Sequence, residues 1–275
     1  MKMKKLIAVI LLLACVASLG ACSLNEVSVK YKKAEGGLAV SGYTDKTVIT
    51  EFTVPDEVDG VPVVAINDFG LCNAESLLKI TIGKNVKEIG TWALTNNQHV
   101  TEYAVDPENE YFCAVDGVLF TKDMKTLCFY PSGRNIAFDK YGTALNTTEY
   151  AIPDGVETIR SKAFYKCYYV DITDFPDSVT RIEEKAFHRA SALTDFEVPA
   201  NLEYIGKDAF SYDALLTELT IPASIREIGE YAFFNCTGLQ RIAVQAKEAE
   251  VTLGEKWQPT AKGRIRTDCE VTFAE

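Results

Sequence analysis

The sequence repeats itself every 23 residues, and this period limits the folds available to the chain. Isoleucines recur at this spacing, and an Ala-Phe pair stands four residues after each of Ile159, Ile182, Ile205 and Ile228. Ile66 and Ile89 extend the register towards the N-terminus. A repeat this short cannot bury its apolar side alone, so successive repeats must stack as the coils of a solenoid.

Each repeat also contains three apolar residues spaced by three and then by two. The trios are Leu193, Phe196 and Val198; Leu216, Leu219 and Ile221; and Leu239, Ile242 and Val244. Residues two apart face the same side of a strand, so each trio predicts one short strand per coil. Pro199 and Pro222 directly follow two of the trios, and a proline ends strand pairing because it has no amide hydrogen. We therefore expect a parallel sheet with strands about 4.8 Å apart.

The pattern resembles the BspA-type leucine-rich repeat, in which Ile-Gly, Ala-Phe and Cys follow one another along each coil. The segment REIGEYAFFNC at 226–236 is one such copy, and the resemblance covers about residues 27–245. It implies a β-rich solenoid with a parallel sheet and short helical turns. Three coils depart from the pattern, because Asn67, Arg160 and Glu183 replace the glycine.

The repeat is interrupted at three places, which divides the expected solenoid at 34–275 into parts. Residues 34–65 alternate apolar and polar side chains and resemble the family's N-terminal cap. Turn signals such as Asp116-Gly117 predict a β-hairpin insertion at 106–146. Residues 245–275 lose the repeat, and we expect them to form a C-terminal cap over the open core.

The N-terminus has the plan of an export signal. Residues 1–21 combine a lysine-rich start, a short apolar run and small residues, which is typical of a secretory signal peptide. The tetrapeptide Leu19-Gly20-Ala21-Cys22 resembles the bacterial lipobox, which implies lipidation of Cys22 and a short tether at 22–33. We expect a protein anchored by lipid in the cell membrane and facing the cell exterior. The alternative is an ordinary secretory cleavage.

The charge narrows the class of partner. The formal net charge is −11, and loss of the signal removes three lysines and no acidic residue, which leaves −14. Such a charge disfavours nucleic acid and disfavours a whole protein that lies flat on an anionic bilayer. We therefore expect no nucleic-acid partner. The family resemblance implies an external protein or glycan as partner, and we expect a monomeric chain.

Six cysteines remain after the signal and Cys22 are set aside. Cys167 and Cys236 occupy the same repeat position three coils apart, about 14 Å, which is beyond the reach of a disulfide. Both are therefore expected to be core thiols. A bridge between Cys113 and Cys128 stays an alternative, and the pattern assigns no role to the other two cysteines.

Nothing in the sequence predicts an enzyme. The chain has two histidines, His99 and His188, and neither lies in a metal-binding or nucleophile motif. His188 occupies a variable repeat position, which predicts a solvated surface residue. We expect no catalytic residue, no cofactor and no metal site. No EF-hand spacing supports calcium binding, and the sequence leaves open whether calcium is involved.

Two groups of side chains are candidates for a binding surface. The outward positions of the middle coils are acidic: Asp171, Asp174, Asp195, Glu197 and Glu218. Like charges on neighbouring strands repel, so such a face favours a basic or cation-bridged ligand; a merely solvated face is the alternative. The aromatic residues Trp92, Tyr165 and Phe234 flank the Ala-Phe position. They could contact sugars or proteins, or half-bury against neighbouring coils.

These features favour one function and leave one alternative. The first is a lipid-anchored bacterial cell-surface repeat protein that binds an external protein or glycan without catalysis. Adhesion is what the family resemblance implies. The alternative is a structural scaffold lipoprotein that organises an envelope complex.

Overall fold

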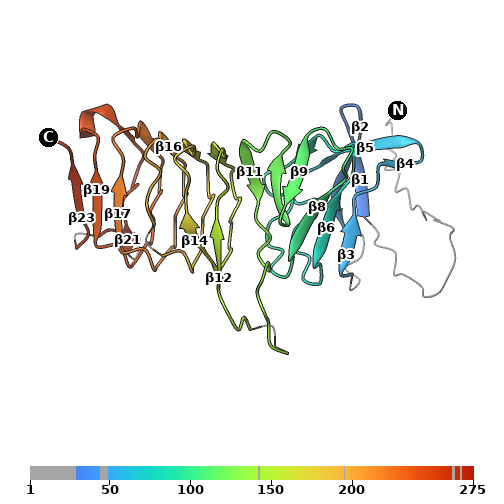
Figure 1. The fold of residues 1–275 in the computed structure, drawn as a ribbon, viewed down its shortest axis with the longest axis horizontal. Helices are drawn as coiled ribbons and strands as arrows, with labels where there is room; N and C mark the ends of the chain where they lie inside the picture. Colours follow the sequence, from blue (N-terminus) through green and yellow to red (C-terminus); the bar gives the residue numbers. More distant parts are fainter. Residues whose placement is uncertain (1–28, 44–48, 142, 195, 262–263, 267) are drawn as a thin grey trace, which may run out of the picture.

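The chain forms an elongated β-solenoid (Figure 1). The computed structural model describes residues 29–43, 49–141, 143–194, 196–261, 264–266 and 268–275. No helix among these residues is long and apolar enough to cross a membrane. The expected repeat solenoid is confirmed, and its first and last described strands, β1 (Val29–Ala34) and β23 (Glu270–Phe273), lie at opposite ends of its long axis.

The apolar trios form the first set of strands, which we call the long-strand side. Ile80 and Ile82 are fully buried, whereas the residues between and before them face outward. Parallel pairing joins these strands in three groups: β3 (Glu51–Thr53), β6 (Lys79–Ile82) and β8 (Glu102–Val105); β12 (Thr148–Ala151) and β14 (Val170–Asp174); β17 (Glu218–Ile221), β19 (Arg241–Val244) and β23 (Glu270–Phe273).

The repeating isoleucines form a second set of parallel strands, the short-strand side. We expected only one sheet. Each of these strands is two residues long, and all but the last bury their second residue; in the last, Leu253 is half-buried. The strands are β7 (Glu88–Ile89), β13 (Thr158–Ile159), β15 (Arg181–Ile182), β16 (Tyr204–Ile205), β18 (Glu227–Ile228) and β20 (Thr252–Leu253).

The Ala-Phe segments close each coil with turns. The resemblance implied short helical turns here, but the described residues contain a single 3₁₀ turn, η1 (Glu248–Glu250), outside the repeats. Lys185 and Arg189 adopt left-handed backbone angles, with φ of 57° and 58°. The amide of Phe187 donates to the carbonyl of Ala209 in the next coil (2.8 Å). Backbone donors therefore join neighbouring coils instead of extending a helix.

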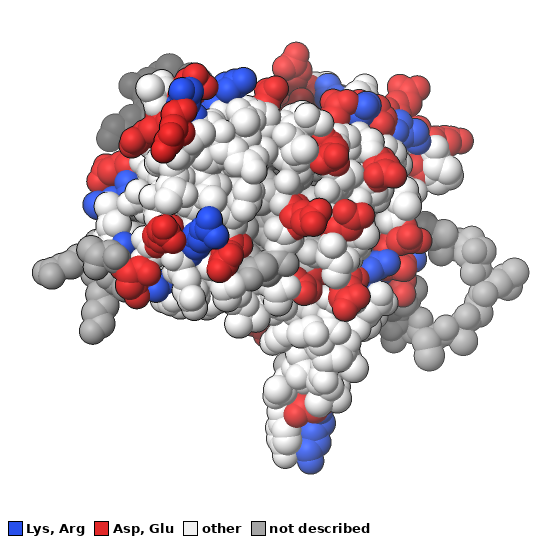
Figure 2. Space-filling model, turned by 60° about the vertical axis from the view of Figure 1, so that its left-hand side comes forward, with Lys and Arg blue, Asp and Glu red and all other residues white. Residues whose placement is uncertain are grey.

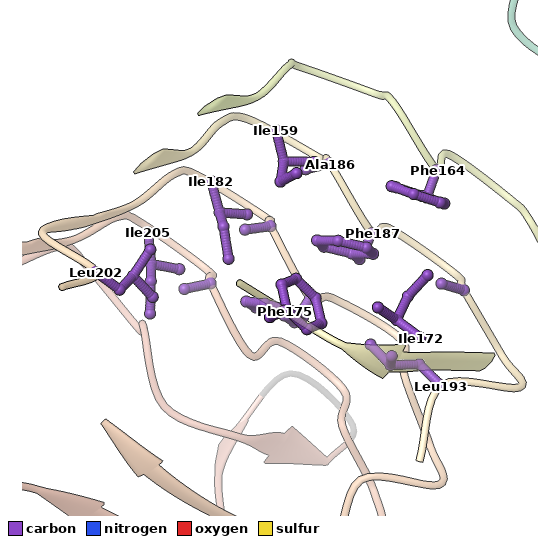
Figure 3. Packing of buried hydrophobic residues seen from close by; sticks show 14 of the residues in the cluster. Ile159, Phe164, Ile172, Phe175, Ile182, Ala186, Phe187, Leu193, Leu202 and Ile205 are labelled. Atoms are coloured by element: carbon purple, nitrogen blue, oxygen red, sulfur yellow. The ribbon is translucent and has the colours of Figure 1, made fainter. Parts of the chain in front are cut away.

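The phenylalanines of the Ala-Phe pairs stack through the core (Figure 3). Phe187 lies 4.9 Å from Phe164 and 5.2 Å from Phe210 between ring centroids, with interplanar angles of 13° and 5°. Phe233 continues the row at 5.6 Å, and Trp257 follows it edge-on at 6.4 Å. The stack is a direct product of the 23-residue period.

A glycine follows the isoleucine at Gly229, where two coils lie in close contact. A Cβ atom added at Gly229 would lie 2.5 Å from the amide nitrogen of Lys207 in the preceding coil. Real Cβ contacts are not this short, so the close stacking of these coils requires glycine.

The N-terminal segments form a mixed sheet. The strands are β1 (Val29–Ala34), β2 (Gly37–Tyr43), β4 (Glu57–Val58) and β5 (Val61–Ile66), in the order β1-β2-β5-β4, and β7 also pairs with β5. β1 and β2 form an antiparallel hairpin, so β1 is an edge strand.

An antiparallel meander interrupts the coils. It comprises β9 (Phe112–Val115), β10 (Val118–Thr121) and β11 (Thr126–Phe129), and β11 joins the short-strand side beside β13. Val118 and Phe120 pack into the C-terminal core, whereas Leu119 packs into the N-terminal core. All three side chains are fully buried. The meander is thus a wall between two hydrophobic cores.

Two peripheral segments complete the fold. The loop with the bridge between Phe138 and Ala144 projects from the side of the solenoid (Figures 1 and 2). Near the C-terminus, β21 (Thr260–Ala261) and β22 (Arg264–Ile265) form a small antiparallel pair.

Candidate functional site

The acidic residues of the middle coils lie on the long-strand side. Asp171 faces outward from β14, and its partner across the strand pair is Glu149 of β12. Asp174 ends β14 and is exposed. Glu149, Asp171 and Asp174 therefore form an acidic face on two neighbouring strands. Figure 2 shows that acidic side chains outnumber basic ones on the visible surface.

Glu149 was missed by the sequence argument because the trio pattern is interrupted in its coil. Asp171 and Asp174 face outward from β14, whereas the side chain of Ile172 between them is buried.

The other predicted acidic residues do not extend this face uniformly. Glu197 is exposed in a segment that is not a strand, and Asp195 lies outside the described residues. Glu218 projects from β17 beside Arg241 of β19, and Arg241 in turn neighbours Glu270 of β23. This alternation of charge means that the five predicted residues are not one continuous acidic strip.

The same alternation occurs at the other end of the long-strand side. Glu51, Lys79 and Glu102 are register partners on β3, β6 and β8, and Lys79 forms an ion pair with Glu102. Like charges meet directly only at Glu149 and Asp171 in the strand pairs of the described chain. The middle of the long-strand side is therefore its electrostatically distinct part.

Asp171 is held in place by the next coil. Its Oδ1 accepts a hydrogen bond from the Thr194 amide (3.0 Å), and its Oδ2 accepts one from the Thr194 hydroxyl (2.8 Å). Both carboxylate oxygens therefore have a hydrogen-bond donor in the neighbouring coil. The Asp171 side chain on the acidic face is therefore held in place by hydrogen bonds from the neighbouring coil.

His188 is not the solvated residue that its position predicted. Its ring stacks on Tyr165 at 5.1 Å, and burial lowers its pKa to about 4. His188 Nδ1 lies 2.6 Å from Ser211 Oγ, and the Ser211 hydroxyl donates to the carbonyl of Asp208 (2.9 Å). The imidazole therefore donates to Ser211 and does not accept its proton. Ser211 is also fully buried, so this pair lacks the geometry of an activated nucleophile.

The aromatic residues that flank the Ala-Phe position contact one another in a row along the turns that contain the Ala-Phe pairs. The row consists of Phe69, Trp92, Tyr165, His188, Tyr212 and Phe234, with ring centroids 5.1–5.8 Å apart. Cations lie over several rings, such as Lys162 over Trp92 (4.4 Å) and Arg189 over Tyr212 (4.8 Å). Trp92, Tyr165 and Phe234 are each half-buried, so most of their ring faces pack within the row.

The six described cysteines are free thiols. Cys167 and Cys236 are buried as expected for core residues. Cys113 and Cys128 stand on strands that flank β10 from opposite sides, and no bridge joins them. Burial raises the pKa of Cys128 to about 12, which keeps its thiol protonated and unreactive.

A family model described as a BspA type leucine-rich repeat region matches six copies in this chain, over residues 42–113 and 134–252. These residues make up more than half of the sequence. The chain belongs to the BspA-type leucine-rich repeat family. No curated protein sequence matches it.

Solved structures of other bacterial repeat proteins share the BspA-type fold of this chain. The pneumococcal vaccine antigen PcpA is 21% identical with a TM-score of 0.61, and the match covers 81% of this chain and 60% of that one. A leucine-rich repeat protein from Eubacterium ventriosum is 20% identical with a TM-score of 0.58, over 78% of this chain and 56% of that one. The chain thus spans little more than half the length of these two proteins.

The BspA-type match stops at the meander, since residues 114–133 lie between its two segments. A cleft of about 830 Å³ opens there between Lys87–Thr91 and the three threonines Thr121, Thr126 and Thr158. β7 pairs only with β5 in the described chain, so its other edge faces this cleft.

Arg160 closes part of the open edge. Its guanidinium donates to the carbonyl of Ile89 in β7 and lies 5.5 Å from the centroid of the Phe129 ring. The side chain thus replaces the amide that the next strand of a regular solenoid would supply. Arg160 stands where the BspA-type repeat has glycine, as do Asn67 and Glu183, and all three residues line the cleft.

Proposed function

We propose that this BspA-type protein is anchored by lipid at Cys22, faces the cell exterior, and binds an external protein or glycan through its long-strand side. The observation that carries the choice of surface is the pairing of Glu149 with Asp171. Two carboxylates on adjacent strands repel each other. A basic ligand group placed between them would relieve this repulsion.

Membership of the BspA-type family supports the binding role. Stacked coils present extended surfaces that suit recognition. Cys22 lies outside the described residues, so its anchoring role rests on the lipobox-like sequence.

Charge reversal on the acidic face tests the binding role. The purified chain without residues 1–21 would be screened on arrays of matrix proteins and glycans, and any ligand titrated. We expect Glu149→Lys with Asp174→Lys to weaken binding about tenfold, which corresponds to about 1.4 kcal/mol. The control is Glu248→Lys with Glu250→Lys, an equal charge change at exposed residues of η1. Equal loss in both variants, or none in the first, would reject the acidic face as the ligand site.

Lipid anchoring is tested by metabolic labelling. Cells that express the chain would be supplied with radiolabelled palmitate, and label should enter the wild-type protein but not Cys22→Ala. Cys15→Ala provides a matched control, since Cys15 lies inside the expected signal, and this variant should label normally. Label that persists in Cys22→Ala would contradict the proposed anchor.

A further inference from the structure

The N-terminal hairpin carries a lysine cluster that the binding proposal does not use. Lys30, Lys32 and Lys33 of β1 are all exposed. The hairpin residues 29–43 hold these three lysines against one acidic residue, Glu35, in a chain with a net charge of −11. None of the ion pairs between described residues involves these lysines.

The cluster extends beyond β1. The ammonium group of Lys87 lies near the hairpin turn, 3.5 Å from where a Cβ on Gly36 would stand. Val29 and Tyr31 pack against the N-terminal core. Side chains alternate along a strand, so Lys30 and Lys32 point away from this core, whereas Lys33 lies on the Tyr31 side and is exposed close to the hairpin turn. The outward face of β1 is thus cationic, and Lys33 adds a third charge at its edge.

The position of this hairpin relates it to the membrane. β1 begins at Val29, seven residues after Cys22, and seven extended residues span at most about 25 Å. A chain anchored at Cys22 therefore keeps β1 within that distance of the lipid headgroups. Each lysine near an anionic membrane surface adds about fivefold to membrane affinity.

We propose that the lysine surface of β1 docks on anionic lipid headgroups and orients the anchored protein. The inference rests on the proposed anchoring at Cys22. Because β1 and β23 lie at opposite ends of the solenoid (Figure 1), this contact holds the C-terminal coils away from the bilayer. The remaining acidic surface is repelled by the same lipids, which favours one orientation.

The lysines also have a simpler explanation to be tested. β1 is the edge strand of its sheet, and exposed lysines on an edge discourage pairing with other chains. That role does not depend on lipid charge, whereas headgroup docking does.

The experiment uses residues 22–275 with an N-terminal hexahistidine tag, tethered to vesicles through a nickel-chelating lipid. One set of vesicles contains phosphatidylcholine only, and the other contains about 30 mol% phosphatidylglycerol. Acylation of each lysine by an amine-reactive reagent is measured by mass spectrometry. On anionic vesicles at low salt, we expect Lys30, Lys32 and Lys33 to react at least fivefold more slowly than on neutral ones. This protection should vanish at 0.5 M NaCl, where charges are screened within about 4 Å.

Matched variants give the second measurement. Replacing Lys30, Lys32 and Lys33 by glutamine should speed release from anionic vesicles at least tenfold and leave release from neutral vesicles unchanged. The control replaces three exposed lysines elsewhere, Lys122, Lys140 and Lys247, and should not change release. Equal labelling on both vesicles, or equal release of both variants, would overturn the proposal and leave edge protection as the role. Because the tag supplies the tether, failure of lipidation at Cys22 in cells would appear only in the palmitate experiment.

Discussion

Replacing Phe187 by alanine is expected to lower the free energy of unfolding by about 3–5 kcal/mol, the usual range for a buried Phe→Ala change. Phe187 is fully buried and stacks between Phe164 and Phe210. Phe175 contacts it edge-on at 5.5 Å. The cavity left by its ring would lie inside a continuous stack whose backbone is fixed by bonds to both neighbouring coils, so the site cannot readily collapse.

The Phe187→Ala variant also tests which part of the chain loses stability. Each coil of a solenoid is stabilised mainly by its neighbours, and the meander separates the N-terminal core from the C-terminal one. Amide hydrogen exchange of the Phe187→Ala variant should therefore accelerate in residues 150–245 and much less in residues 52–105. Phe69→Ala is the control, because Phe69 is 58% exposed and its loss should cost about 0.5 kcal/mol or less. Uniform acceleration along the chain would show that the wall does not insulate the two cores.

The 23-residue period predicted the coils and their inward residues because most coils follow the same apolar pattern. The same isoleucines, alanines and phenylalanines are buried in coil after coil. The second set of strands was not predicted, since two residues per strand are too few to show an alternating pattern. Parallel pairing between coils, rather than the local sequence, creates these strands.

The meander was expected as a hairpin, but its role as an internal wall was not. Val118, Leu119 and Phe120 are consecutive apolar residues, and such a run is compatible with any strand buried on both faces. Only the three-dimensional structure shows that the two faces contact different cores. The cleft beside β7 follows from this insertion. The three residues that replace the repeat glycine, Asn67, Arg160 and Glu183, all line this cleft.

The acidic face was predicted in part. Asp171 and Asp174 lie on it, but the neighbouring Glu149 belongs to a coil whose trio pattern is interrupted. Glu218 was counted as part of an acidic patch because a repeat pattern shows position and not neighbours. The charge of Arg241 on the next strand changes the meaning of that position. The cross-strand partners therefore had to be known before the charge of this surface could be predicted.

Asp213 shows how the repeat can also place an unfavourable residue in the core. It occupies the position that Asn97, Cys167 and Cys236 hold in other coils. Asn97 uses this position well, because its amide donates to the carbonyls of Leu71 (2.8 Å) and Leu94 (3.0 Å). Asp213 is fully buried, and neither of its carboxylate oxygens has a hydrogen-bond partner. A charged carboxylate cannot donate to the carbonyls that this position offers.

We therefore expect Asp213→Asn to stabilise the protein by about 1–3 kcal/mol at neutral pH, the cost of an unsatisfied buried polar group. Burial raises the pKa of Asp213 well above its ordinary value. The folded state therefore holds a proton that the unfolded state releases, so this residue makes wild-type stability fall as pH rises above about 4.

Urea titrations of both proteins between pH 4 and pH 8 measure this effect. The gain from Asp213→Asn should be smallest near pH 4 and grow with pH until the folded carboxyl loses its proton. The reciprocal change Asn97→Asp, at the same repeat position, should destabilise the protein with the same pH dependence. A gain from Asp213→Asn that stays constant over this range would contradict the argument, because titration of the buried carboxyl is the only source of the expected slope. The Asp213 carboxylate would then be charged in the folded protein and would have a hydrogen-bond partner in solution.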